Sequence, residues 1–315
     1  MAKGRTLTFG DPDGYAAAFG DVRVNLTIAG AGDFRARLTR FKLNHLEIFR
    51  CYECLPRIAY ISLLPERTFL SFPVATESLR CGGLALRNGD MVLHSGGERV
   101  HQRSNGDCEW GLLSLPPEQL ASCGKTLVAG PIASPPTSRI LRPSRAETSR
   151  FRSLFRQACH LAETRKGWIE RPEIARALEQ EMLLAIVHCL AASEADDHPR
   201  GRRHHAAIMD RFEETLSKRI DRKLSMPTLC AEIGVAERTL RMCCAEFLGV
   251  SPTRYLLLQR LNKARAALRR ADPSKASVAE VARNHQFREL GRFSVTYRTT
   301  FGELPSTTLQ RAPQT

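Results

Sequence analysis

The chain has 315 residues, which is enough for two domains of ordinary size. With 43% apolar and 25% charged residues it can bury real cores, and the composition excludes an intrinsically disordered chain. The net charge of +14 makes a polyanion, either nucleic acid or an anionic membrane surface, the first partner to consider.

The sequence predicts neither a membrane span nor a secretion signal. The longest apolar run, residues 182–192, is interrupted by His188 and has about half the length that a bilayer requires. The N-terminal segment contains no apolar stretch of the kind that secretion signals carry. We therefore expect a cytoplasmic protein with no membrane partner, whose ten cysteines are reduced, buried thiols.

The basic charge is concentrated in the last third of the chain. Residues 199–315 contain 22 basic and 11 acidic residues, so most of the net charge lies there. The segment just before it, residues 194–205, contains Pro, Gly and blocks of both charges without apolar periodicity. We predict an exposed linker at 194–205 that separates a domain at 1–193 from a domain at 206–315.

The first domain shows a β-rich pattern followed by a helical one. Between about residues 20 and 128, short apolar or alternating runs are separated by Pro, Gly, Asn and Asp, which predicts a β-sandwich or small barrel. Apolar residues then recur at helical spacing over 151–161 and 174–189, with Gly167 between the two segments. This pattern predicts an antiparallel helix pair, with Pro172 in the first turn of its second helix. The apolar stripes of the pair suit either the intrachain core or a partner subunit.

The second domain is helical throughout, and one pattern occurs in it twice. Two short helices joined by a turn are predicted at about 227–248 and again at 277–302, and a long helix at about 253–270 connects the two units. Each unit has a small residue, Ala231 or Ala282, where its helices would cross closely. Two such units in the most basic part of the chain indicate a double helix–turn–helix domain that binds DNA.

The stretch from Cys230 to Leu309 resembles the DNA-binding domain of AraC/XylS-type transcription regulators. The resemblance is carried by Leu240, the segments at 247–255 (FLGVSPTRY), 260–265 (RLNKAR) and 278–282 (VAEVA), and by Leu268, Phe287, Phe293, Tyr297, Arg298, Phe301, Gly302, Pro305 and Ser306. The β-rich first half resembles, more loosely, the cupin-like sensory domain of many such regulators. The resemblance implies an α+β chain with a cupin-like N-terminal domain plus a helix pair, followed by an all-α double helix–turn–helix domain.

A function follows from this resemblance. It implies sequence-specific binding of double-stranded DNA by a transcription regulator of the activator type, which has no enzymatic activity and needs no cofactor. It adds RNA polymerase, a small-molecule effector and a second copy of the chain as partners. Activation is an expectation from the resemblance alone, because the sequence itself names neither the effector nor the operator and does not distinguish activation from repression.

The family motif also places the side chains that would face DNA. On the first recognition helix these are Glu237, Arg238, Arg241 and Met242, and on the second they are Leu290, Gly291, Ser294 and Val295, flanked by Arg288, Arg292 and Arg298. Arginine paired to guanine edges is the commonest specific contact, so base reading by the first helix is favoured over phosphate contact alone. The second helix offers few hydrogen-bonding groups, and its three arginines are expected to contact phosphates.

The chain departs from the family pattern at three places. Ala236 stands where a capping Ser is usual, which weakens the helix start by about 1 kcal/mol. Cys243 and Cys244 replace larger residues, so a smaller core is expected there. Gln286 stands where Gly is usual, so we expect the turn of the second unit to be built differently.

Candidate metal sites in the first domain are weak. Cys51 and Cys54 have zinc-ligand spacing, but no second pair accompanies them, and on a strand they would point to opposite faces. His94 and His101 suggest a metal-binding cupin, yet the close His-x-His pair is missing, and we predict no metal. An effector at the mouth of the barrel is expected to contact His94, Arg99, His101 and Trp110.

Two other functions remain open at this point. A cupin-type metalloenzyme with a basic tail would require a ligand set that the sequence lacks. An architectural protein would bind DNA through phosphates alone and show no preference among sequences.

Overall fold

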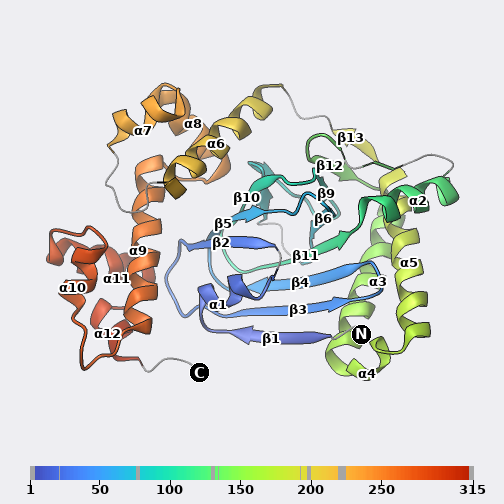
Figure 1. Cartoon of the computed structure of the whole chain (residues 1–315), viewed down its shortest axis with the longest axis horizontal. Helices are drawn as coiled ribbons and strands as arrows, with labels where there is room; N and C mark the ends of the chain where they lie inside the picture. Colours follow the sequence, from blue (N-terminus) through green and yellow to red (C-terminus); the bar gives the residue numbers. More distant parts are fainter. Residues whose placement is uncertain are drawn as a thin grey trace.

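A computed structural model describes residues 4–20, 22–75, 79–128, 132–133, 135–191, 193–196, 200–218 and 225–311. Two antiparallel sheets and a group of helices form the N-terminal part, and a set of mostly short helices forms the C-terminal part (Figure 1). This is the α+β organisation that the sequence predicts.

The N-terminal domain is built on two sheets whose paired strands all run antiparallel. In spatial order, the eight-stranded sheet contains β1 (Arg5–Phe9), β3 (Ala36–Lys42), β4 (Glu47–Glu53), β11 (Cys108–Leu115), β6 (Thr68–Pro73), β9 (Met91–His94), β12 (Arg139–Arg142) and β13 (Glu194–Asp196). The five-stranded sheet contains β2 (Arg23–Ile28), β5 (Arg57–Ser62), β10 (Arg99–Ser104), β7 (Arg80–Cys81) and β8 (Leu84–Ala85). A short helix, α1 (Pro12–Ala17), follows β1.

The two sheets pack face to face as a sandwich. Phe49 and Leu112 from the larger sheet share one buried apolar cluster with Val24 and Ile61 from the smaller sheet. On β11 the side chains alternate, because Leu112 belongs to this cluster whereas Leu113 lies in a second cluster on the other face. The larger sheet is thus buried on both faces, which explains why its strands have nearly continuous apolar sequences.

Helices cover the outer face of the larger sheet. They are α2 (Pro117–Val128), α3 (Arg145–Thr164), α4 (Lys166–Ile169) and α5 (Pro172–Ala191), and α5 begins at the predicted proline. Phe151 and Phe155 of α3 and Met182 and Ile186 of α5 are buried in the second cluster. The predicted helix pair is confirmed. Its apolar stripes serve the intrachain core, so a dimer contact of the pair would have to use its other faces.

A charged side chain is buried inside the sandwich and is held by several donors. Glu53 accepts hydrogen bonds from the Tyr15 hydroxyl (2.7 Å), the Trp110 indole (3.0 Å) and the Arg57 guanidinium (3.2 Å). Burial, followed by the nearby Cys51 and Glu53, raises the pKa of Tyr15 well above its usual value, so its hydroxyl remains a donor at neutral pH. The carboxylate thereby ties α1, β4, β5 and β11 together.

The C-terminal part contains the predicted helices, with bounds that differ by a few residues, and one helix that was not predicted. The predicted ones are α6 (Arg200–Lys218), α7 (Met226–Ile233), α8 (Glu237–Phe247), α9 (Pro252–Arg270), α10 (Val278–Asn284) and α11 (Leu290–Phe301), and the additional helix is α12 (Pro305–Gln310). Among the helices that the structure describes, none has the combination of length and apolar character that crossing a membrane requires.

The predicted exposed linker at 194–205 is mostly regular structure. Residues 194–196 form β13, which pairs with β12, and α6 begins at Arg200, inside the predicted linker. The helix extends backwards because His205 and Arg202 both contact Glu246 of α8, at 2.7 and 3.6 Å, and this holds its first turns. Residues 197–199, within the predicted linker, lie outside the described part of the chain.

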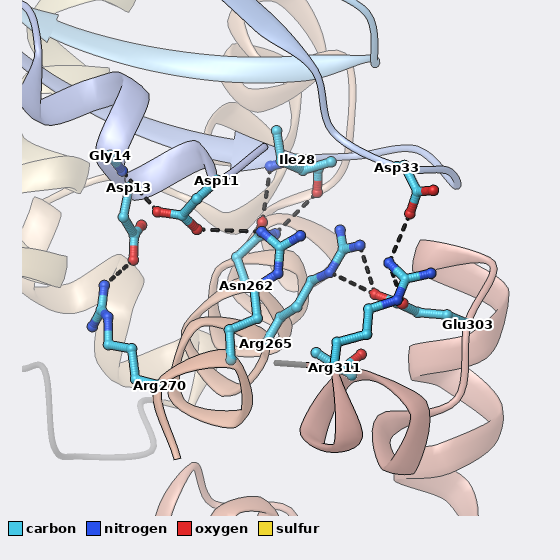
Figure 2. A network of polar contacts seen from close by, with 12 residues as sticks. Asp11, Asp13, Gly14, Ile28, Asp33, Asn262, Arg265, Arg270, Glu303 and Arg311 are labelled. Carbon is cyan, nitrogen blue, oxygen red and sulfur yellow. Dashed lines mark hydrogen bonds and ion pairs between the residues drawn. The ribbon is translucent and has the colours of Figure 1, made fainter. Parts of the chain in front are cut away.

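The two domains are in direct contact through α9 and the end of β2. The Asn262 side chain accepts a hydrogen bond from the Ile28 amide (3.0 Å) and donates one to the Ile28 carbonyl (2.9 Å). Ion pairs surround this contact and join Arg269 to Asp11, Arg270 to Asp13, and Arg311 to Asp33 (Figure 2). The side-chain amide of Asn262 thus bonds both backbone polar groups of Ile28, as the backbone of a neighbouring strand would.

The buried carboxylate yields a stability prediction. Replacing Glu53 with alanine leaves Arg57 charged and buried, and we expect the free energy of unfolding to fall by about 3–5 kcal/mol. Urea denaturation followed by tryptophan fluorescence measures this change. Glu118→Ala, at an exposed position, should change stability by less than about 0.5 kcal/mol. Equal stability of the two variants would contradict the structural role of Glu53.

Candidate nucleic-acid interface

The first helix–turn–helix unit comprises α7 and α8. Ser225 caps α7, because its hydroxyl accepts a hydrogen bond from the Thr228 amide. Gly234 ends the helix in the left-handed conformation (φ 75°), which glycine adopts without steric cost. Ile233 and Leu240 are buried in a core of their own, which fixes the angle between the two helices.

The second unit comprises α10 and α11 and has a related turn. Ser277 caps α10 by accepting a hydrogen bond from the Glu280 amide (3.1 Å). Gln286 takes the left-handed conformation (φ 64°), and the next amide, that of Phe287, donates to the Ala282 carbonyl five residues back. In the first unit Val235, which follows Gly234, donates to Cys230 in the same way. The two turns thus share the left-handed residue and this hydrogen bond, but they also differ: the Gln286 amide donates to Arg283, three residues back, whereas the Gly234 amide donates to Cys230, four residues back. The left-handed conformation costs roughly 1–2 kcal/mol for a non-glycine residue.

The outward face of α8 carries the residues that the sequence analysis selected. Met242 is 52% exposed, and Arg238 and Arg241 are exposed beside it. Arg241 forms an ion pair with Glu237 one turn earlier (2.6 Å), so its guanidinium is held against the helix surface. Among the described residues, Arg238 has no ion-pair partner and extends from the face free to contact another molecule.

The opposite face of α8 is buried. Cys243 and Cys244 pack there with Leu240 and Phe247 in the core of the first unit. The two small thiols fill positions where larger residues were expected, and burial raises the pKa of Cys243 to about 11, with a smaller contribution from Glu246. Both thiols therefore stay protonated at neutral pH and act as apolar packing groups.

The outward face of α11 is less polar. Val295 is 68% exposed, Gly291 is exposed, and Leu290 and Ser294 are half-buried. The flanking arginines Arg288, Arg292 and Arg298 are all exposed. This helix presents apolar groups at its centre and positive charge around them.

A further arginine, which the sequence analysis did not select, lies near this face. Arg260 of α9 lines a groove of about 290 Å³ together with Arg288 and Arg292. Its guanidinium lies over the Phe287 ring (5.0 Å to the centroid), and burial lowers its pKa. The helical spacing of Thr253, Leu257 and Arg260 in the sequence indicates that they share one face of α9, and in the structure all three line the groove.

The long helix α9 lies between the two units (Figure 1). Tyr255, near its start, belongs to the core of the first unit, whereas Leu261 and Leu268 belong to the cluster that contains the second. Arg265 is buried and pairs with Glu303 (2.6 Å), and it also lies 4.5 Å from the centroid of the Phe301 ring. These contacts fix the end of α11 to α9.

The structure does not bring the four expected effector residues together. Trp110 lies inside the sandwich and is bound to Glu53, whereas His94 of β9 contacts Ser71 of the neighbouring strand β6 (2.7 Å). His101 lies on the other sheet, and its Nε2 contacts Glu213 of α6 (2.8 Å). Arg99 is exposed on the same strand as His101. These side chains face different parts of the molecule.

The candidate metal ligands are also separated. Cys51 is buried in the sandwich, whereas the Cys54 thiol, just after β4, accepts a hydrogen bond from the Arg35 amide (3.1 Å). Within the described residues, no group of three or more His, Cys, Asp or Glu side chains is arranged to hold a metal ion.

Comparison with known proteins identifies the C-terminal part. Residues 229–311 match the family model of a helix–turn–helix domain. The probable thc operon regulatory protein of Rhodococcus erythropolis is 31% identical over 166 residues, which cover 50% of each chain. The XylDLEGF operon transcriptional activator 2 of Pseudomonas putida is 33% identical over 100 residues, covering 32% of this chain and 64% of that one. The C-terminal domain is of the AraC/XylS type.

The extent of these matches is limited to part of each relative. The chain spans about half the length of the curated relatives that it matches. A solved structure, that of the AraC-like transcriptional activator CuxR, aligns with 82% of this chain and 95% of its own, with 17% identity and a TM-score of 0.43. The family model covers both helix–turn–helix units of the AraC/XylS-type domain and the α9 helix between them.

The start of α8 yields a prediction. Ala236 occupies the N-cap position and makes no side-chain hydrogen bond there, as its sequence position predicts. Serine at this position can accept from a first-turn amide, so Ala236→Ser should stabilise the protein by about 0.5–1 kcal/mol, measured as a rise in Tm. Ala236→Val adds bulk without an acceptor and serves as the control. If both variants gave the same Tm, capping would not be the cause.

Proposed function

We propose that this protein is a sequence-specific regulator of transcription that binds double-stranded DNA with both units of its AraC/XylS-type domain. The observation that carries the proposal is that the outward faces of α8 and α11 are uncovered while their opposite faces are buried. Exposed methionine and valine at the centre of such faces are unfavourable in water and suit contact with base edges and thymine methyl groups.

The length of α9 supports binding by both units to one duplex. Its 19 residues span about 28 Å at 1.5 Å per residue. Successive major grooves on one side of DNA are about 34 Å apart, and recognition helices docked at the two ends of the rod can reach neighbouring grooves.

The two units are expected to contribute differently. Arg238 and Arg241 on α8 offer guanidinium groups for guanine edges, with Glu237 orienting Arg241. Around α11, Arg288, Arg292 and Arg298 surround a mostly apolar centre, and Arg260 adds charge beside them. We assign sequence discrimination mainly to the first unit and phosphate contacts mainly to the second.

Regulation is assigned to the N-terminal domain, which contacts α6 and the α9 helix that holds both units. His101 of β10 contacts Glu213, which also accepts a hydrogen bond from Tyr255 at the start of α9. Asn262 contacts Ile28 nearer the other end of the same helix. An effector that shifts the sandwich would therefore alter how α9 holds the units. In this proposal the protein acts in the cytoplasm, alone or as a pair of chains, and recruits RNA polymerase as an activator.

Base reading by α8 is tested by substitution. Arg238→Ala should weaken binding to the preferred DNA by about 1–3 kcal/mol at particular base pairs and leave affinity for random DNA nearly unchanged. Competition binding at fixed salt measures both affinities, after the preferred sequence has been selected from random duplexes. Arg171→Ala, in the N-terminal domain, is the matched control and should leave both affinities unchanged.

Two outcomes would contradict this proposal. If Arg238→Ala and Arg241→Ala weakened binding equally on all sequences, the arginines would be phosphate contacts and the protein a non-specific DNA binder. If the wild-type protein showed no preference of at least roughly 10³ for any selected sequence over random DNA, sequence-specific regulation would be excluded.

The coupling between domains is tested at Asn262. Asn262→Ala removes the two hydrogen bonds to Ile28, so the Ile28 amide should exchange its hydrogen at least about tenfold faster, as expected for a loss of about 1–3 kcal/mol. Asn284→Ala, at an exposed position on α10, should leave this exchange rate unchanged. An unchanged rate in the Asn262 variant would show that this contact does not hold the domains together.

A further inference from the structure

A basic pocket lies on the N-terminal domain, on the side away from the DNA-binding helices. It has a volume of about 830 Å³ and opens between the turn at 88–90, the end of β12 and the first half of α3. Figure 1 places α3 at the opposite end of the molecule from α10 and α11. The turn packs closely against α3 here, because a Cβ atom at Gly89 (φ 104°) would lie only 3.3 Å from the Thr148 methyl group.

Arginines dominate the pocket wall. Arg145, Arg152 and Arg156 recur on α3 at helical spacing and form a stripe about 16 Å long, and Arg142 adds a fourth guanidinium. Within the described part of the chain, Arg145 and Arg156 are exposed and have no ion-pair partner.

The carboxylates near the pocket do not neutralise this stripe. Among the described residues of its lining, Asp90 is the acidic one, and it accepts a hydrogen bond from the Arg87 amide and lies 3.8 Å from Arg142. Glu147, in the first turn of α3, does not line the pocket and is engaged with Ser144 in the helix cap. Glu109, whose charge also acts on Arg152, is paired with Arg50 (2.6 Å), so the stripe keeps a net positive charge.

Arg152 is held in place at the centre of the stripe. Its guanidinium donates to the Asn88 side chain and to the Val74 carbonyl, both uncharged acceptors. Burial, and then the neighbouring Arg156, lower the pKa of Arg152. The like charges of Arg152 and Arg156, four residues apart, repel each other, and an anion bound between them would attract both guanidinium groups and offset this repulsion.

We propose that this pocket binds a small anionic molecule that carries at least two phosphate or carboxylate groups. A single group of this kind reaches at most two of the guanidinium groups, whereas the stripe extends over three helical turns. The hydroxyls of Ser149 and Ser153, which also line the pocket, supply neutral donors between the charges. The amides at the start of α3 add a favourable field for an anion.

The pocket is separate from the expected effector site inside the sandwich, and the inference stands without the proposed DNA binding. None of His94, Arg99, His101 and Trp110 lines it. Its distance from α8 and α11 argues for a small ligand rather than the DNA that those helices would hold (Figure 1).

The test is direct binding by the full chain. Isothermal titration at low salt with pyrophosphate, inorganic phosphate and citrate should give saturable binding, with pyrophosphate or citrate at least tenfold tighter than phosphate. The double variant R145Q/R156Q, which alters two exposed side chains, should weaken that binding at least tenfold. R150Q is the matched control, because Arg150 lies on the same helix outside the pocket and pairs with Glu181 (3.3 Å).

The arms of this experiment distinguish the two ligand chemistries. Tighter binding of pyrophosphate would identify a phosphorylated ligand, and tighter binding of citrate would identify a polycarboxylate. The proposal is overturned if none of the three probes binds saturably, or if R150Q weakens binding as much as the double variant does. It is also overturned if R145Q/R156Q loses affinity for DNA, since the arginines would then be DNA contacts.

Discussion

The apolar face of a single helix, α9, organises the C-terminal half of the molecule. Tyr255 and Leu258, in its first two turns, are buried, and so are Leu261, Ala264 and Leu268 further along. Because the first of these packs into the core of one unit and the last three into the cluster that holds the other, the rod cannot tilt without disturbing both cores. The spacing of α8 and α11 is therefore a property of side-chain packing along α9.

The polar contacts between the domains complement this packing. Arg269, Arg270 and Arg311 reach three aspartates of the N-terminal domain, and they lie away from the outward faces of the recognition helices. Exposed ion pairs of this kind contribute little energy each and are screened by salt. The apolar cluster shared by the sandwich and the second unit supplies most of the free energy that holds the two domains together. The ion pairs fix the orientation of one domain on the other.

The helices of the C-terminal domain follow from local signals and were predictable. Ser277 caps α10 and Pro252 begins α9 where capping and proline rules place them. The linker was not predictable from local composition, because Arg202 and His205 become helical through contacts with Glu246, about forty residues away. The left-handed Gln286 shows the same limit, since tertiary packing of Phe287 against Phe293 outweighs the preference for glycine.

Most residues selected on α8 and α11 are exposed, since a helical pattern separates buried from outward faces, whereas Leu290 and Ser294 are half-buried; their contact with DNA stays a prediction. The residues of the N-terminal domain were harder to place. Alternation along a strand does not reveal which sheet a strand joins, so His94 and His101, seven residues apart, were expected on one site although they lie on different sheets. Arg152 and Arg156 lie beside the 88–90 turn only because α3 packs back across the larger sheet.

The two helix–turn–helix units differ in how many residues of the sandwich take part in their apolar cores. The first has a core in which Ile58 is the sandwich residue, and the rest comes from α6 to α9. In the second unit Phe293, Tyr297 and Phe301 pack with Leu261 and Leu268 of α9, and this apolar cluster continues into the interior of the sandwich. Excising the chain at α6 would remove Ile58 from the first core and the whole sandwich side of the second cluster, while the packing of the second unit against α9 would remain, so the two halves of the DNA-binding domain are unequal as folding modules.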